Sequence, residues 1–267
     1  MLPLSAKSKL EELVALAGGT TLDKFKRIKS LLAKGTDPNG LSETGVSPLM
    51  AAIGNGDLDV IRLLIKHGAD PESTIDIVYP LNIVYPRGKK ELTYSALMRA
   101  CAELRQLEVI DLLVSAGADP DREIQGWTAL MYAAKSGSSK HIRRLTQKGA
   151  NVDFQAASGK TALMIAASCG RARGVETIVQ LGANRMLVDE DGLSAADHAL
   201  NAKRYALEPK RKALAGFLAS GDQELPPDVK GPEIDRVLCP SCSVYTTREI
   251  AEKTRGECLY CFGYYNR

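Results

Sequence analysis

Four cysteines near the C-terminal end of the sequence have the type and spacing that metal binding requires. They form two pairs, Cys239 with Cys242 and Cys258 with Cys261, in the pattern C-x2-C-x15-C-x2-C. Two residues between thiolates make a tight turn whose two sulfurs reach one metal ion, and two such turns supply four tetrahedral ligands. The spacing therefore predicts a four-cysteine zinc site. Because the protein would fill all four positions, we expect this zinc to be structural and not catalytic.

The other two cysteines favour a reducing compartment. Cys101 and Cys169 stand singly, far from the cluster, whereas secreted domains usually pair their cysteines in a disulfide framework. We therefore expect a cytoplasmic protein, with zinc thiolates in preference to disulfides. A segment of about 30 residues with few apolar groups should not fold without its metal. The tail at 236–267 resembles a zinc ribbon or a related treble-clef-like knuckle, and both variants fit the sequence.

The charge of the tail bears on what it binds. Residues 231–267 carry five basic and five acidic side chains, whereas a phosphate-binding surface needs a positive excess. The tail also holds five aromatic residues, and nucleic-acid bases stack on such rings. These are Tyr245, Tyr260, Phe262, Tyr264 and Tyr265. We favour their packing in a small core or against a protein, with contact to DNA, RNA or a nucleic-acid machine as the alternative.

Composition argues against several classes of function. The 267 residues carry a net charge of +3 with 25% charged residues, so no overall bias points to nucleic acid or membrane. The apolar stretches are too short for a membrane span, and Glu11 and Glu12 interrupt the N-terminal one, which argues against a secretory signal. The common phosphate-loop, nucleophile-elbow and zinc-protease motifs are absent. We therefore expect no membrane association, no small-molecule substrate, no catalytic residues and no enzyme activity.

Upstream of the tail, one stretch of sequence occurs twice. Residues 126–134 read GWTALMYAA and residues 159–167 read GKTALMIAA, and each runs on to Gly-Ala-Asn. Equivalent positions lie 33 residues apart, and a fixed period of about 20 to 50 residues is typical of a stacked repeat array. Thr128 stands where a helix N-cap is needed, and Gly149 stands where a left-handed residue ends a second helix. No single repeat can cover its own apolar face, so we expect the stack to be the folding unit.

This pattern resembles the ankyrin repeat, a β-turn followed by two antiparallel helices. The resemblance covers residues 20–218 and implies an all-α solenoid of about six repeats, including the caps. It leaves an N-terminal helix within 1–19, a linker at 219–235 with three prolines and two glycines, and the zinc ribbon at 236–267. The family's T-P-L-H histidine is replaced by methionine at four positions, Met50, Met98, Met131 and Met164. We interpret these methionines as core residues.

One repeat carries an insertion. From a turn glycine to the next helix start takes 12 residues in three other repeats (35 to 47, 149 to 161 and 182 to 194) but 27 between Gly68 and Ser95, so 15 extra residues lie within 72–93. The segment is rich in β-branched and aromatic residues but contains Pro80 and Pro86. We therefore expect an extended finger in preference to a regular hairpin. The helix pair that follows is one residue longer than the others, from which we expect a longer first helix.

An ankyrin array implies a non-enzymatic scaffold that binds another protein. The resemblance places its contacts at the repeat tips and on the exposed face of each first helix, to which we add the finger. Trp127 is the only tryptophan and lies at a tip, where an aromatic ring can anchor a partner or pack on the next tip. The expected partner-binding residues are Trp127, Tyr94, Tyr79, Tyr85, Glu103, Lys135 and Lys160.

Overall fold

The computed structural model describes residues 4–20, 23–78, 91–202, 208–224, 236–238 and 245–247. The chain divides into two compact units, residues 1–225 and residues 226–267. Within the described residues, no helix is both long and apolar enough to cross a bilayer.

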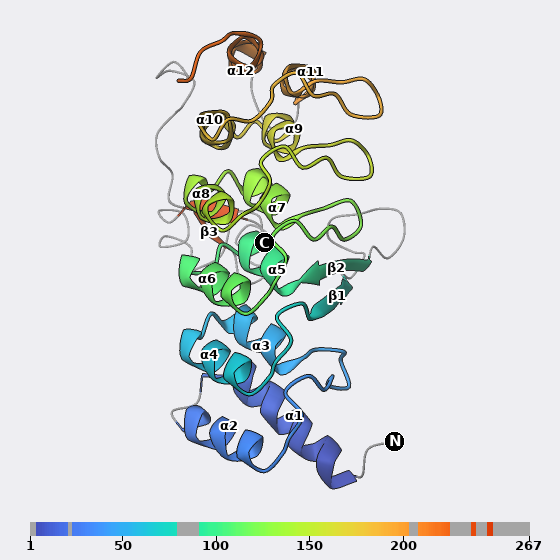
Figure 1. The fold of residues 1–267 in the computed structure, drawn as a ribbon, viewed down its shortest axis with the longest axis vertical. Coiled ribbons are helices and arrows are strands. Elements are labelled where there is room, and N and C mark those ends of the chain that lie inside the picture. The colour runs from blue at the N-terminus through green and yellow to red at the C-terminus, as the bar shows by residue number, and fades with distance from the viewer. Residues whose placement is uncertain are drawn as a thin grey trace, which may run out of the picture. The chain divides into compact units, whose positions relative to one another are not determined.

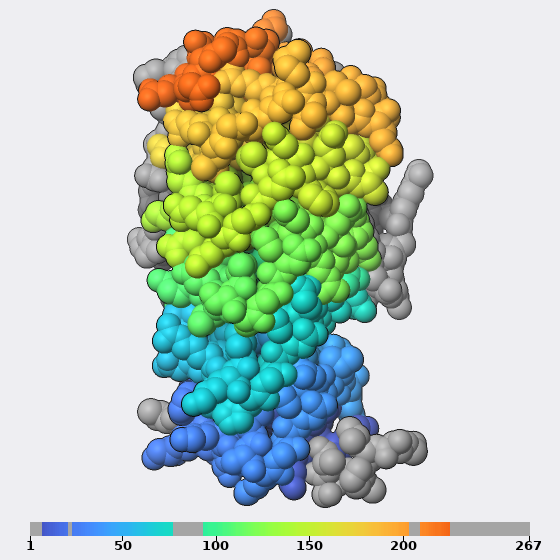
Figure 2. Space-filling view, in the orientation of Figure 1, coloured from blue at the N-terminus to red at the C-terminus, as the bar shows by residue number. Residues whose placement is uncertain are grey.

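The first unit is a stack of antiparallel helix pairs. Figure 1 shows α3, α5, α7, α9 and α11 in one column and α4, α6, α8, α10 and α12 in a second column, with the tips of the repeats to one side. In the space-filling view the repeats follow one another as successive bands of colour (Figure 2). The pairs are α1 (Leu4–Gly18) with α2 (Lys24–Ala33), α3 (Pro48–Asn55) with α4 (Leu58–Lys66), α5 (Ala96–Ala102) with α6 (Leu107–Ser115), α7 (Ala129–Ser136) with α8 (Ser139–Gln147), α9 (Ala162–Ser168) with α10 (Ala172–Gln180), and α11 (Ala195–Asn201) with α12 (Glu208–Ala219).

Side-chain caps fix where the first helix begins in the five pairs from α3–α4 to α11–α12. The Thr128 hydroxyl accepts a hydrogen bond from the Met131 N–H at 3.3 Å, as the sequence predicts. Ser47, Ser95, Thr161 and Ser194 do the same in their own repeats. Each hydroxyl satisfies a backbone donor that the first helical turn leaves without a partner. The caps therefore set a common register for the stacked helices.

The core runs along the stack between the two columns. The methionines at the family's histidine position are at most 1% exposed, which confirms that they are core residues. Alanines such as Ala133 and Ala166 are fully buried beside them, so neighbouring first helices approach closely. Each repeat thus buries its apolar face against the next one.

The N-terminal helix is part of this stack. Helix α1 packs on α2 and α3 and belongs to the first compact unit. The Glu11 carboxylate accepts a hydrogen bond from the Glu43 N–H at 2.7 Å, and Glu12 pairs with Arg27. The N-terminal helix expected within 1–19 is therefore α1, and it forms the first helix of an N-terminal pair with α2.

The insertion begins and ends in a regular β-ladder. Strand β1 (Thr74–Val78) pairs antiparallel with β2 (Glu91–Ser95), residue for residue from Thr74 opposite Ser95 to Val78 opposite Glu91. The fold is therefore mostly helical with a small antiparallel sheet, and neither the all-α expectation nor the preference against a regular hairpin holds here. Both prolines fall in 79–90, as do Tyr79 and Tyr85, so they lie outside the described residues.

The extra residue of the following repeat lies in a turn. Helix α5 has seven residues, whereas α3 and α7 each have eight, so the expected longer first helix is wrong. The chain instead makes a wider connection between α5 and α6, where Leu104 adopts a left-handed φ of 50°. Glycine fills the equivalent place in two other repeats, as Gly56 and Gly137, because a side chain is disfavoured in that conformation.

The second unit contains a short ladder. Strand β3 (Arg236–Leu238) pairs antiparallel with β4 (Tyr245–Thr247), with Leu238 opposite Tyr245. The four cysteines predicted to bind zinc lie outside the described residues.

Candidate functional site

Three aromatic rings lie close together where the β1–β2 ladder (Thr74–Val78 with Glu91–Ser95, hereafter the hairpin) meets the fourth repeat. Tyr94 comes from β2, Trp127 from the tip before α7, and Tyr132 from α7 itself. The Tyr132 ring centroid lies 5.0 Å from that of Tyr94 and 4.9 Å from that of Trp127. The Lys135 ammonium, one helical turn further along α7, lies 5.3 Å from the Trp127 ring centroid. Such tilted ring pairs and cation–π contacts each stabilise a structure by about 0.5–1.5 kcal/mol.

These four side chains differ in exposure. Tyr94 and Tyr132 are 7% and 6% exposed, whereas Trp127 is half-buried and Lys135 is exposed. The expectation that Tyr94 offers a free contact surface is therefore corrected, because its ring packs between the hairpin and α7. Trp127 does both things considered from the sequence: it packs on Tyr132 and keeps part of its surface accessible. Trp127 and Lys135 together form the accessible part of the cluster.

Glu103 is engaged within the fold. Its carboxylate accepts hydrogen bonds from the Arg99 Nε at 2.8 Å and from the Arg105 Nη2 at 2.6 Å. The two arginines also cross to the preceding repeat, where Arg99 donates to the Met50 carbonyl at 2.8 Å and Arg105 donates to the Gly54 carbonyl. The Glu103 side chain is 19% exposed. Its charge therefore acts first as the counter-ion of two arginines that join neighbouring repeats.

Lys160 lies on the next tip along the stack. It occupies the position of Trp127 one 33-residue period later. Its carbonyl accepts the Ala156 N–H at 3.0 Å, which closes the turn, and its side chain is half-buried. Trp127 and Lys160 therefore mark equivalent places on consecutive tips, and Lys135 extends the same surface onto a first helix.

A ladder of hydrogen bonds holds the tips at fixed spacing. In each case the acceptor is a side chain four residues after the turn glycine, and it accepts the backbone N–H of the Asp or Asn in the next turn. Asp121 accepts from the Asn151 N–H at 2.9 Å, and Asp153 accepts from the Asn184 N–H at 2.8 Å. Asn39 and Glu72 do the same for Asp70 and Asp119. The sequence reasoning missed this ladder, although the acceptors at 39, 72, 121 and 153 follow each turn at a constant offset.

Two of the histidines make hydrogen bonds that support the fold. The His67 Nδ1 lies 2.8 Å from the Leu63 carbonyl at the end of α4. His141 is 7% exposed and crosses between repeats, with its Nε2 2.7 Å from the Arg105 carbonyl and its Nδ1 2.8 Å from the Ser138 hydroxyl. A carbonyl can only accept, so the Nε2 carries the proton and the neutral Nδ1 accepts from the serine. Burial lowers the pKa of His141 below its ordinary value.

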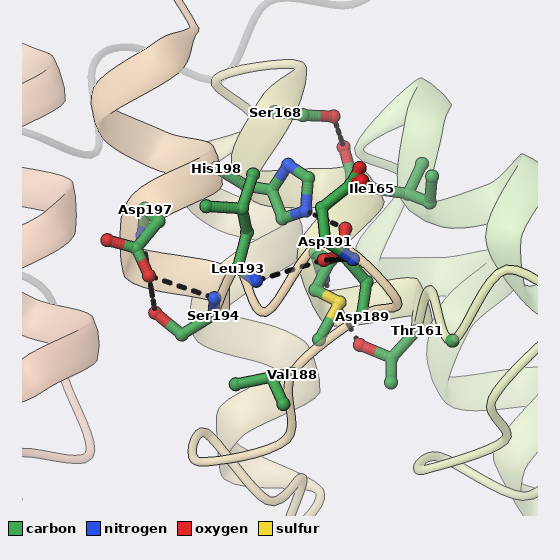
Figure 3. Close-up of polar contacts among 12 residues, drawn as sticks. Thr161, Ile165, Ser168, Val188, Asp189, Asp191, Leu193, Ser194, Asp197 and His198 are labelled. Carbon is green, nitrogen blue, oxygen red and sulfur yellow. Dashed lines mark hydrogen bonds and ion pairs between the residues drawn. The ribbon is translucent and has the colours of Figure 1, made fainter.

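The third histidine belongs to a polar cluster in the last repeat. Figure 3 shows His198 facing Asp189, with 2.8 Å between its Nε2 and the Asp189 carboxylate. The same carboxylate accepts the N–H groups of Asp191 and Leu193 at 3.1 and 3.0 Å. Burial alone would raise the pKa of Asp189, but the bonds from the Leu193 N–H and the His198 ring outweigh burial and lower it. Asp189 thus organises the last tip and ties it to α11.

The geometry of this cluster is that of a cap. The Ser194 hydroxyl donates to the Asp197 carboxylate at 2.6 Å, and the Asp197 N–H returns a bond to Ser194 at 3.3 Å (Figure 3). The hydrogen bond from the Ser194 hydroxyl lowers the pKa of Asp197. The Ser194 hydroxyl is therefore bound to Asp197, whereas the His198 ring is bound to Asp189. The reciprocal bonds between Ser194 and Asp197 form a helix capping box. Among the residues that the structure describes, no group of three or more metal-ligating side chains is found.

Comparison with known proteins agrees with this architecture. A family model described as ankyrin repeats (3 copies) matches residues 20–124 and 97–189. The chain belongs to the ankyrin-repeat family. Ankyrin repeats are generally protein-interaction scaffolds and are generally non-enzymatic.

Individual relatives align with part of this chain. A putative ankyrin repeat protein of fowlpox virus is 30% identical over 146 residues, which cover 54% of this chain and 29% of that protein. The ankyrin repeat and KH domain-containing protein mask-1 of Caenorhabditis elegans is 29% identical over 177 residues, covering 58% of this chain and 7% of that protein. A crystal structure of an ankyrin repeat domain from Acinetobacter baumannii aligns with a TM-score of 0.60 and 26% identity, covering 79% of this chain and 98% of that chain. The chain thus spans less than a third of these two curated relatives.

Proposed function

We propose that this ankyrin array is a non-enzymatic adaptor that binds a partner protein through the surface formed by Trp127, Lys135 and the base of the hairpin. One observation carries the proposal: the only tryptophan keeps accessible surface beside an exposed lysine, while the rings behind it are buried. Tryptophan over a rigid, buried support is the residue type that dominates protein interfaces. The tip ladder holds this surface in place without a partner, so little ordering entropy is lost on binding.

A matched pair of charge reversals tests this proposal. Lys135 on α7 and Lys140 on α8 are both exposed lysines of the same repeat, one on a first helix and one on a second helix. Tagged full-length protein is used to capture partners from its native cells. Lys135→Glu should remove the captured protein, while Lys140→Glu should retain it. If both variants capture the same proteins in the same amounts as the unaltered chain, the proposed surface is wrong.

We further propose that Cys239, Cys242, Cys258 and Cys261 bind one structural zinc ion in a reducing compartment such as the cytoplasm. Strands β3 and β4 support this, because they are antiparallel neighbours and the connection between them contains the first cysteine pair. A knuckle between two paired strands brings its two sulfurs toward one side. The tail would then act as a second protein-docking module attached to the array.

Metal analysis tests the zinc proposal directly. Protein purified without added metal should contain one zinc per chain, and Cys258→Ser should lower that content sharply. Mass spectrometry under denaturing conditions should find four free thiols among these residues. Two disulfides and no zinc would contradict the proposal, and a salt-dependent shift of labelled single-stranded RNA or DNA, lost in Cys258→Ser, would favour the nucleic-acid alternative.

A further inference from the structure

A hydrogen bond at the base of the hairpin shows which of its residues bond across the ladder and which point outward. The Ala96 N–H donates to the Ser73 carbonyl at 3.0 Å, immediately below the pair formed by Thr74 and Ser95. In an antiparallel ladder, residue pairs alternate between those that bond each other and those whose backbone groups point outward. Thr74 and Asp76 are therefore outward-pointing residues on β1, as Thr93 is on β2.

The outer edge of β2 is covered. The Thr93 N–H donates to the Gln125 Oε1 at 3.4 Å, and the Gln125 Nε2 donates to the Thr93 hydroxyl at 3.3 Å. Gln125 lies in the tip that precedes α7 and holds a left-handed φ of 52°. A side chain of the next repeat thus takes the place of a third strand on this side of the hairpin.

The outer edge of β1 has no such cover. Within the part of the chain that the structure describes, no hydrogen bond is found to the outward N–H or C=O of Thr74 or Asp76. Asp76 is exposed, and its carboxylate accepts a bond from the Thr93 hydroxyl at 2.7 Å across the ladder. Thr74 and Asp76 together present two donors, two acceptors and one negative charge along a single line. In Figure 1, β1 is the strand of the hairpin on the side of α3.

We propose that the β1 edge, defined here as the outward backbone of Thr74 and Asp76, binds an extended basic segment of a partner protein as an added strand. Backbone pairing to an exposed edge provides affinity, and alternate side chains provide specificity. A lysine or arginine opposite Asp76 would meet its carboxylate, as opposite charges do across neighbouring strands. The inference rests on the proposed adaptor function and assigns one chemistry to its partner.

The charge of the edge also bears on self-pairing. Charged side chains on edge strands protect proteins from edge-to-edge aggregation. If two copies paired through antiparallel β1 edges, their Asp76 carboxylates would be brought near each other, which is unfavourable. A basic segment meets no such repulsion. The occupant that suits this edge is thus a different chain carrying positive charge.

Two substitutions separate the backbone from the charge. Thr74→Pro removes an outward donor without removing a bond of the β1–β2 ladder, and proline is tolerated at the first residue of an edge strand. Asp76→Asn removes the charge and keeps the backbone. Asp191→Asn is the matched control, because Asp191 is an exposed carboxylate on the last tip. Far-UV circular dichroism and melting temperature check that each full-length variant is folded.

The probe is a labelled peptide of about ten residues in which lysine alternates with threonine and valine, compared with the same peptide carrying glutamate for lysine. The lysine peptide should shift the backbone amide signals of Thr74 and Asp76 in NMR spectra. Its affinity should fall by about tenfold in Thr74→Pro, the effect of one lost hydrogen bond, and by about threefold in Asp76→Asn, as for an exposed ion pair. Asp191→Asn should bind as the unaltered chain does.

The inference is overturned if no amide shifts appear at millimolar lysine peptide, if the lysine and glutamate peptides bind equally, or if a folded Thr74→Pro binds undiminished. Concentration-dependent dimerisation that protects the Thr74 amide would also overturn it, because the occupant would then be a second copy. If the peptide experiments fail but Lys135→Glu still abolishes partner capture, the proposed adaptor function is supported and only the role of the β1 edge is wrong.

Discussion

Placing a methyl group at Gly54 should reveal how strongly the arginines join the second and third repeats. A Cβ at Gly54 would lie 2.4 Å from the Arg99 Nη2, well inside van der Waals contact. Because the guanidinium is the far end of a flexible side chain, it can withdraw, but it then loses its 2.8 Å bond to the Met50 carbonyl. Gly54→Ala therefore tests this bond without altering either partner.

The expected magnitude follows from two opposing effects. A hydrogen bond from a charged donor contributes about 1.5–3 kcal/mol, and Arg99 is shielded here, with 17% of its side chain exposed. Replacing glycine by alanine in a helix stabilises it by about 0.5–1 kcal/mol. The free energy of unfolding should thus fall by about 1–2 kcal/mol in Gly54→Ala. In an Arg99→Ala background the clash is gone, and the same substitution should raise it by about 0.5 kcal/mol.

The free energy of unfolding is measured by urea denaturation, followed by circular dichroism and Trp127 fluorescence. The four proteins are the unaltered chain, Gly54→Ala, Arg99→Ala and the double variant. Gly216→Ala is the matched control, because Gly216 is a helical glycine of α12 with no atom within 4 Å of an added Cβ. It should stabilise the chain in both backgrounds by about 0.5–1 kcal/mol. The reasoning is refuted if Gly54→Ala destabilises the chain equally with and without Arg99, or if it stabilises the unaltered chain.

Three further predictions concern joints elsewhere in the stack. Burial lowers the pKa of His141, so as the pH falls below about 6.5 the unfolded chain binds a proton at this histidine more readily than the folded chain does. The free energy of unfolding should then fall by up to about 1.4 kcal/mol per pH unit. In urea titrations at several pH values, His141→Gln should flatten this slope. Asp121→Ala, which removes the acceptor for the Asn151 N–H, should lower the free energy of unfolding by about 1 kcal/mol, whereas Asp121→Asn keeps an acceptor and should lose less than half of that. Arg185→Ala removes a 2.9 Å bond to the Phe217 carbonyl, so amide exchange near the end of α12 should accelerate while exchange in α4 stays unchanged.

Local signals made much of the array predictable from the sequence. Thr128 and Gly149 act within a few residues of themselves, as a cap and as a left-handed helix stop, and a repeated period multiplies such signals. The hydroxyl caps therefore follow from spacing, and the buried methionines follow from the family pattern in which they replace a histidine. The zinc site rests on the same kind of local spacing and stays a prediction.

Features that depend on contacts between repeats were harder to predict. The prolines argued against a hairpin, but Thr74–Val78 pairs with Glu91–Ser95, and both prolines lie outside the described residues. The packing of α1 on α3 and the fit of Arg99 over Gly54 join segments that the sequence separates by an insertion or a loop. The sequence predicted Tyr94 to be an exposed tip residue, because its burial depends on contact with Tyr132 of the next repeat. Each miss is a tertiary contact that no local pattern records.

The most direct test of the central claim is hydrogen–deuterium exchange of the full chain with and without its captured partner. The account predicts that protection gained on binding falls on residues 74–78, 91–95 and 124–136, which form the hairpin base, the Trp127 tip and α7. Peptides from α4, α8 and α10 should be unchanged. Protection confined to those second helices, or found only in residues 226–267, would contradict the assignment of the partner surface to the tips and first helices.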